Sequence, residues 1–331
     1  MKKSVVLSVL LLASTWSVAQ DRIIIVPNWN VGDQRRLHYT EKTYEMENDT
    51  VRIDTQEEWD ASLKVTKSTA AAFIVELVHK DATMRQLEDF HNKIGSAPKY
   101  KDLVLRYKVD KKTGKTELEN WKEAQQFVQG EFELIAKAVG EEDAEAGAAM
   151  EAILSPLTSL LDDEAKVKSY FNDELGFLTS AYGHDLMQRD TLRIVEKGEN
   201  PLQPGDSLST TTLMTISSHD LAKQRMVVRT EVIFDMSKFV EMMKSMMVQM
   251  IEAFAKADAN SKGKEKEIAE AKKKMQEAMD SMEMSVKNQT LTTINTLTSW
   301  PVKVVTTARV TAKEPRKTSL RTVTRTVDVR E

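Results

Sequence analysis

Hydrophobic and polar positions alternate along residues 32–80, and this pattern predicts β-structure. Thr, Val, Ile and aromatic residues recur there with a period of two. Asn48-Asp49 and residues 67–69 interrupt the alternation and supply turns. A further strand is expected over Leu103–Val109, followed by a hairpin turn at Lys111–Gly114. These segments predict consecutive antiparallel strands.

A second block of β-structure is predicted to begin at Gly205 and to run to Asp235. The chain then ends in three Thr-rich strands, QTLTTINTLTSW, PVKVVTTARVTA and TSLRTVTRTVDVR. Gly32-Asp33 and Gly205-Asp206 each open a block that leads into helix. This repetition suggests an internal duplication of about residues 28–175 and 190–331.

Two stretches with helical periodicity interrupt the strands. Asn120 precedes Trp121 and Glu123 follows three residues later, which predicts a capping box at the start of a helical region over 120–172. A second insertion over 235–286 has two helical arms separated by a break near Gly263, and this predicts an antiparallel helical hairpin. A short helix is also expected over 83–94.

Together these elements predict an α+β fold in a single domain over residues 20–331. A curved antiparallel sheet is built from the two strand blocks and packs on the helical insertions, including the methionine-rich hairpin. The chain of 331 residues has no cysteine, so its core must provide stability without disulfides.

The N-terminus predicts export. Lys2 and Lys3 precede an apolar run from Val5 to Ala13, and Ser17 and Ala19 fit the small residues of a cleavage site. Residues 1–19 are therefore expected to be a signal peptide. The mature protein is expected in the periplasm or outside the cell, without a lipid anchor and without a transmembrane segment. A formal net charge of −4 argues against a nucleic-acid partner.

Three segments carry a resemblance to known proteins. They are NWNVGDQRRLHYT (28–40), YKVDKKTGKTELENW (107–121) and INTLTSWPVKVVTTARV (294–310). This combination resembles exported bacterial proteins of an uncharacterised domain family, which carry a strand-initiating Gly-Asp and a late strand–turn–Trp/Gly–Pro–strand segment. The order of elements also resembles periplasmic lipoprotein carriers, and that resemblance implies a curved sheet around a hydrophobic cavity.

Catalytic and metal motifs are weak. His184-Asp185 and His219-Asp220 place histidine beside aspartate, but neighbours on a strand point to opposite faces. Glu88 and His91 form one Glu-x-x-His, and the second copy, Glu76 with His79, falls in a predicted strand. A hydrolase using His184 or His219 is therefore the least favoured class, and neither a cofactor nor a metal is expected.

The most unusual feature is the concentration of six of the 17 methionines in residues 236–254. One reading is an ordinary packed core, in which methionine fills irregular gaps. A thioether site for Cu(I) is a second reading, although the methionines are surrounded by Phe, Val and Ile. The third is an adaptable groove for a hydrophobic ligand. The candidate ligand-binding residues are Met236, Phe239, Met243, Met246, Met247, Met250, Phe254, Met275, Met279 and Met282.

These observations favour an exported, non-enzymatic binding protein. It would hold a hydrophobic ligand such as a lipid, or a hydrophobic protein segment, between the sheet and the methionine-rich helices. The alternative is a structural or assembly protein of the cell envelope with a fully packed core, which would contact other envelope proteins through exposed sheet edges.

Overall fold

The computed structural model describes residues 22–80, 102–142, 158, 161–188, 190–199, 207–234, 270, 273, 283–314 and 317–331. In chain order the strands are β1 (Arg22–Ile24), β2 (Gln34–Glu47), β3 (Thr50–Ser68), β4 (Ala72–His79), β5 (Leu103–Asp110), β6 (Thr116–Leu118), β7 (Asp185–Met187), β8 (Thr191–Glu199), β9 (Ser207–Asp220), β10 (Arg225–Phe234), β11 (Glu283–Asn295), β12 (Pro301–Glu314) and β13 (Lys317–Arg330). The helices are α3 (Trp121–Glu142) and α5 (Glu164–Thr179).

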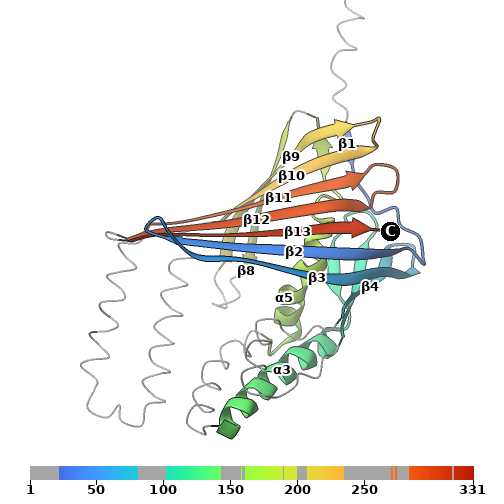
Figure 1. The fold of residues 1–331 in the computed structure, drawn as a ribbon. Helices are drawn as coiled ribbons and strands as arrows, with labels where there is room; N and C mark the ends of the chain where they lie inside the picture. The colour runs from blue at the N-terminus through green and yellow to red at the C-terminus, as the bar shows by residue number, and fades with distance from the viewer. Residues whose placement is uncertain are drawn as a thin grey trace, which may run out of the picture.

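Eleven of the strands form one antiparallel sheet in the order β6-β5-β4-β3-β2-β13-β12-β11-β10-β9-β8, and β1 pairs with β7 in a separate two-stranded sheet. Nearly all neighbours are consecutive along the chain. The exception is the central pair of β2 and β13, which joins the two ends of the chain. Within the described residues β6 and β8 do not pair with each other, so the sheet is open. The strands lie side by side in a curved, twisted array (Figure 1).

The fold is therefore predominantly β with helical insertions. This confirms the predicted antiparallel sheet, but strands make up a larger share of the described structure than the predicted α+β class implies. The turn predicted at Asn48-Asp49 is confirmed. Both residues have positive φ, 45° and 62°, as the tight turn between antiparallel strands requires. Asn48 also joins the neighbouring hairpin, since Thr318 donates its backbone N–H to Asn48 Oδ1 over 2.8 Å.

Helix α5 packs against one face of the sheet, which we call the inner face. Asp163 begins the helix, because its side chain accepts a hydrogen bond from the N–H of Lys166. Phe171, Leu175 and Leu178 are buried against strand residues of the inner face. The long strands extend well beyond α3 and α5 toward the hairpin ends (Figure 1). The helices thus cover only part of the inner face.

Two aromatic residues from opposite ends of the chain stack in this core. The rings of Trp29 and Trp300 lie 4.3 Å apart at 14°, and the guanidinium of Arg35 lies 4.8 Å from the Trp300 ring. Trp300 Nε1 donates to Asp33 Oδ2 over 3.3 Å, and Tyr182 donates its hydroxyl to the carbonyl of Ser299. The two sequence signatures, Gly32-Asp33 and Trp300-Pro301, are therefore in contact in the folded protein.

The structure corrects three expected boundaries. The second strand block begins with β8 at Thr191 and not at Gly205. Residues 283–286, expected to be the end of a helix, belong to strand β11 (Glu283–Asn295). The first helical region does not stop near Asn172, since α5 continues to Thr179. In each case pairing or packing with distant residues decides a boundary that local periodicity leaves open.

The capping box at Asn120 is also wrong in its chemistry. Helix α3 does begin at Trp121, but the Asn120 side chain faces strand β5. Its Oδ1 accepts from the N–H of Arg106 at 2.7 Å, and its Nδ2 donates to the carbonyl of Val104 at 2.8 Å. The backbone N–H of Glu119 donates to the carbonyl of Arg106. Asn120 thus extends the β-ladder beyond β6.

Candidate functional site

All ten residues of the predicted ligand-binding set lie outside the described residues. These are Met236, Phe239, Met243, Met246, Met247, Met250, Phe254, Met275, Met279 and Met282. The chain leaves β10 at Phe234 and re-enters the described structure in β11 at Glu283, apart from Glu270 and Lys273. Glu88, His91 and the helix expected over 83–94 lie outside the described residues as well.

The register of the strands places the inner-face side chains in transverse rows. Where α5 covers the sheet, one row is mainly apolar and runs through Trp59, Tyr39, Val327, Val304, Thr292 and Val228. The next row toward the hairpin ends, which we call the polar row, runs through Glu57, Glu41, Arg325, Thr306, Thr290 and Thr230. The inner face therefore changes from apolar to polar within one step of the strands.

Apolar side chains return beyond the polar row. Val323, Ala308, Val310, Val286, Val232 and Phe234 alternate onto the same face and are all half-buried, and we call them the distal apolar patch. Asn288 lies among them, directly opposite Val232 and Ala308. Val232 and Phe234 lie on β10 and Val286 lies on β11, which are the strands that lead into and out of the methionine-rich segment, and the other three residues lie on β12 and β13.

A cluster of polar and aromatic side chains marks the border between the covered and uncovered parts of the inner face. It consists of Tyr39, Glu41, Trp59, His79, Glu174 and Arg325, and we call it the Tyr39–Glu174 cluster. Four strands and α5 contribute to it. The Tyr39 and Trp59 rings stack at 4.9 Å and 4°, and the Arg325 guanidinium carbon lies 5.7 Å from the Trp59 ring centre. Sequence reasoning did not find this cluster, because its members are separated along the chain.

The charges of the cluster are unevenly paired. Arg325 places both Nε and Nη2 at 2.9 Å from Glu41 Oε2. Glu174 lies 3.8 Å from His79 Nε2, which is beyond hydrogen-bond distance. Burial raises the pKa of Glu174; Arg325 opposes this shift, and Glu41 adds to it. Burial also raises the pKa of the Tyr39 hydroxyl strongly, so this group is a neutral phenol at physiological pH.

Several buried polar atoms on the inner face have no hydrogen-bond partner within the part of the chain that the structure describes. They include the Tyr39 hydroxyl, Thr230 Oγ1, Thr292 Oγ1 and Asn288 Oδ1. Tyr39 and Thr292 have no exposed surface, and Thr230 is 7% exposed. An unsatisfied buried group of this kind costs roughly 1–3 kcal/mol relative to a hydrogen-bonded one.

The two histidines of the hydrolase hypothesis lie in different elements, His184 directly before β7 and His219 in β9. His184 is half-buried, and burial lowers its pKa. His219 lies at the end of β9, where its Nδ1 is 3.1 Å from Gln188 Nε2. The expectation that Glu76 and His79 face opposite ways is confirmed: Glu76 pairs with Arg106, whereas His79 faces Glu174. Among the described residues no group of three or more His, Asp or Glu side chains could hold a metal ion.

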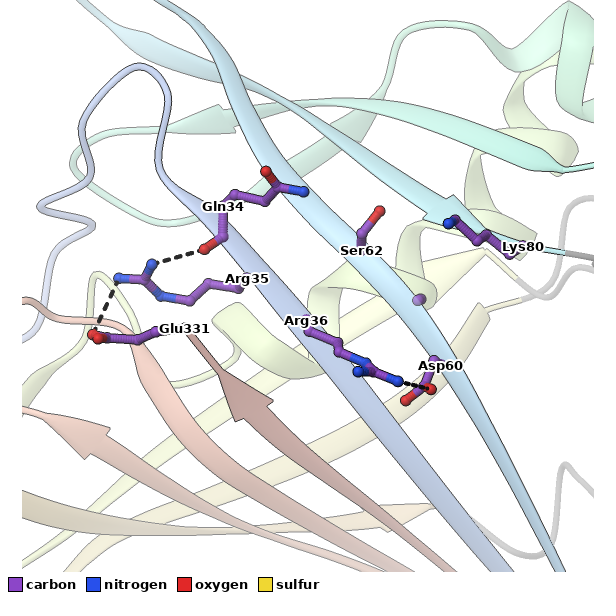
Figure 2. Close-up of a pocket in the computed structure, with 8 residues that line it drawn as sticks. Gln34, Arg35, Arg36, Asp60, Ser62, Lys80 and Glu331 are labelled. Atoms are coloured by element: carbon purple, nitrogen blue, oxygen red, sulfur yellow. Dashed lines mark hydrogen bonds and ion pairs between the residues drawn. The ribbon is translucent and has the colours of Figure 1, made fainter.

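A separate open pocket of about 650 Å³ lies where β2 begins and β13 ends (Figure 2). It is lined by Gln34, Arg35, Arg36, Asp60, Ala61, Ser62, Lys80 and Glu331. Arg36 Nη2 is 2.5 Å from Asp60 Oδ2, and Arg35 is 4.0 Å from Glu331. The hydrogen bonds from Arg36 and then His38 hold the pKa of Asp60 below its ordinary value. Most of its charges are thus already compensated within the pocket.

Comparisons with known proteins give no relative for this chain. No family model and no curated protein matches it. Among solved structures, a match to Ail, the attachment invasion locus protein of Yersinia pestis, covers 91% of this chain and 99% of that chain. The sequence identity is 4% and the TM-score is 0.14, so the match carries no argument. In the parts of the chain described by the structure, no helix has the length and hydrophobicity to cross a bilayer.

Proposed function

We propose that this is an exported, non-enzymatic binding protein that holds a hydrophobic ligand, or a hydrophobic protein segment, against the inner face of the sheet. In this proposal the methionine-rich segment between β10 and β11 would supply the opposite wall. Methionine suits such a wall, because its flexible thioether side chain adapts to ligands of different shape. The predicted signal peptide places this function in the periplasm or outside the cell.

The composition of the inner face supports this proposal most directly. The distal apolar patch lies beyond the part covered by α5, and its side chains are only half-buried. A contiguous exposed apolar surface rimmed by polar groups is typical of a binding site. Thr230 in the polar row and the buried Tyr39 hydroxyl one row nearer the core both lack a hydrogen-bond partner among the described residues. The apolar tail of an amphipathic ligand would cover the distal apolar patch, and its polar head would hydrogen-bond to the hydroxyl groups of Thr230 and Tyr39.

The test is recovery of a bound ligand from the native protein. The mature protein is purified without detergent from its own host, extracted with organic solvent and analysed by mass spectrometry. We expect a hydrophobic compound to copurify in stoichiometric amount. Val323→Glu places a charge in the distal apolar patch and should abolish recovery. Val195→Glu is the matched control, since Val195 is 57% exposed on the edge strand β8 and faces away from the patch.

Two results would contradict the proposal. One is native protein without any copurifying hydrophobic compound. The other is equal recovery from Val323→Glu and Val195→Glu, because the ligand would then lie elsewhere. Circular dichroism of both variants confirms that each retains the fold.

One observation favours the alternative of an envelope assembly protein. Strand β8 is the last strand of the sheet and pairs with β9 alone among the described strands. The other end of the sheet is protected, because Asn172 of α5 accepts a hydrogen bond from the N–H of Leu118 in β6. An unpaired edge can add a strand from a partner. Proline at Ile194 or Val195 should then abolish copurification of an envelope protein, while ligand recovery would be unaffected.

A further inference from the structure

The Tyr39–Glu174 cluster has the chemistry of a head-group site, and this inference rests on the proposed function. Its position between the packed core and the distal apolar patch would place the polar end of an amphipathic ligand at the cluster and its apolar tail along the patch. The charge and hydrogen-bonding state of the cluster then decide which head group fits.

The charges in the cluster favour a cation. Glu57 lies directly opposite Glu41, and Glu41 is paired with Arg325. Glu174 adds a third carboxyl group, which is 34% exposed and lies 3.8 Å from His79. Among the described residues of the cluster and the adjoining polar row, Arg325 is therefore the one permanent cation beside three carboxyl groups. Because Arg325 already directs two nitrogens at Glu41, it is poorly placed to bind a second anion.

The hydrogen-bonding groups lead to the same conclusion. The Tyr39 hydroxyl is fully buried without a partner and can accept a hydrogen bond. The carboxyl group of Glu174 also accepts hydrogen bonds when ionised. A protonated amine supplies three donors and one positive charge, so it matches both groups. The stacked Tyr39 and Trp59 rings form an aromatic wall of the kind that attracts cations, and the Arg325 guanidinium already lies 5.7 Å from the Trp59 ring centre.

We infer that the Tyr39–Glu174 cluster binds the ammonium group of a long-chain amine or of an amine-bearing lipid, with Glu174 as the residue that determines head-group specificity. A carboxylate head would meet Glu41, Glu57 and Glu174. A neutral alcohol would gain the hydrogen bonds but lose the charge attraction. The expected binding affinity therefore decreases from the amine to the alcohol to the carboxylate.

The test compares three probes with the same tail. Dodecylamine, dodecanol and dodecanoate are titrated into the full mature protein below their critical micelle concentrations, and binding is followed by calorimetry. We expect the amine to bind about tenfold more tightly than the alcohol, the size of effect expected for one charge-assisted hydrogen bond, and dodecanoate to bind most weakly. Glu174→Gln should remove the preference for amine and leave dodecanol affinity within about twofold.

The matched control is Glu164→Gln. Glu164 lies on the same helix and its pairing with Lys168 is on the surface, so this variant makes the same change in net charge away from the cluster. It should retain the amine preference. Preference for dodecanoate, equal affinity for all three probes, or loss of preference in both variants would overturn the head-group inference and leave the proposed function intact. Failure of all three probes to bind would also overturn the head-group inference, whereas the proposed function is decided separately by the copurification experiment.

Discussion

Replacement of Asn120 tests whether this residue is a helix cap or part of the sheet. Both ends of its side-chain amide bond the β5 backbone, at Arg106 N–H and at the Val104 carbonyl, and the residue is 8% exposed. Asn120→Ala leaves one donor and one acceptor without a partner. At about 1–3 kcal/mol for each group, reduced where water reaches the half-exposed Val104, we expect a loss of about 2–4 kcal/mol in the free energy of unfolding.

Asn120→Asp separates the two interpretations. Aspartate is as good a helix N-cap as asparagine, so a capping role predicts a change of a few tenths of a kcal/mol. In the ladder role, aspartate cannot donate to the Val104 carbonyl and places a carboxylate oxygen against it. We therefore expect Asn120→Asp to lose nearly as much stability as Asn120→Ala.

The assay is urea unfolding at neutral pH, followed by far-ultraviolet circular dichroism and tryptophan fluorescence. Both variants should shift the midpoint downward without changing the slope, which would indicate lower stability of the same folded state. If Asn120→Asp unfolds within about 0.5 kcal/mol of the parent protein, the ladder role is refuted and the capping role stands.

Three further predictions concern the remaining parts of the fold. Gly183 has φ of 74°, and a Cβ added there would lie 2.4 Å from Thr113 Cα, so Gly183→Ala should lower the free energy of unfolding in urea by about 2–5 kcal/mol. A Cβ added at Gly130 in helix α3 meets nothing within 4 Å, so Gly130→Ala should raise the free energy of unfolding by about 0.5–1 kcal/mol. Equal effects of the two substitutions would refute this reasoning. Burial raises the pKa of Glu174 above its ordinary value of 4.5. Below pH 4.5 the carboxyl group is neutral in both the folded and the unfolded state and has no such effect on stability. As the pH rises from 4.5 towards the raised pKa, ionisation favours the unfolded state, so the carboxyl group increasingly destabilises the folded protein. Glu174→Gln should accordingly stabilise the protein more near about pH 8 than near about pH 4, and an effect independent of pH would contradict the raised pKa. The Thr292 hydroxyl is fully buried between Val304 and Val228 and has no hydrogen-bond partner among the described residues. Thr292→Val should therefore raise the free energy of unfolding of the ligand-free protein by about 1 kcal/mol. A clear decrease of stability in thermal unfolding would show that the hydroxyl has a partner.

Strands were the most predictable part of the fold, for a local reason. Val and Thr alternate along β12 and β13, and this pattern suits a pleated surface whatever lies next to it. The turn at Asn48-Asp49 was predictable too, since these residue types tolerate positive φ. Strand β8 was missed, because TLRIVEKGE combines a glycine with charged residues and pairs only through β9.

The candidate site was not predictable from sequence patterns. Tyr39, Trp59 and Glu174 each look ordinary in their own segment, and their significance comes from the register that aligns β2 with β3 and from the position of α5. The methionine-rich set was visible because it is local, and it stays a prediction. Among the described histidines, His79 belongs to the cluster and lies 3.8 Å from Glu174, a position that its Glu-x-x-His motif did not predict.

The sequence alone determined the alternation of strands and helices, the tight turns, the predicted signal peptide and the absence of disulfides, because each depends on neighbouring residues or on composition. Only the tertiary structure decided that β2 lies beside β13, that Trp29 stacks on Trp300, and that a polar row crosses the inner face between two apolar regions. These features depend on strand register and on contacts between residues as far apart in the sequence as Arg36 and Arg330, and hydrophobic periodicity carries no information about such pairings.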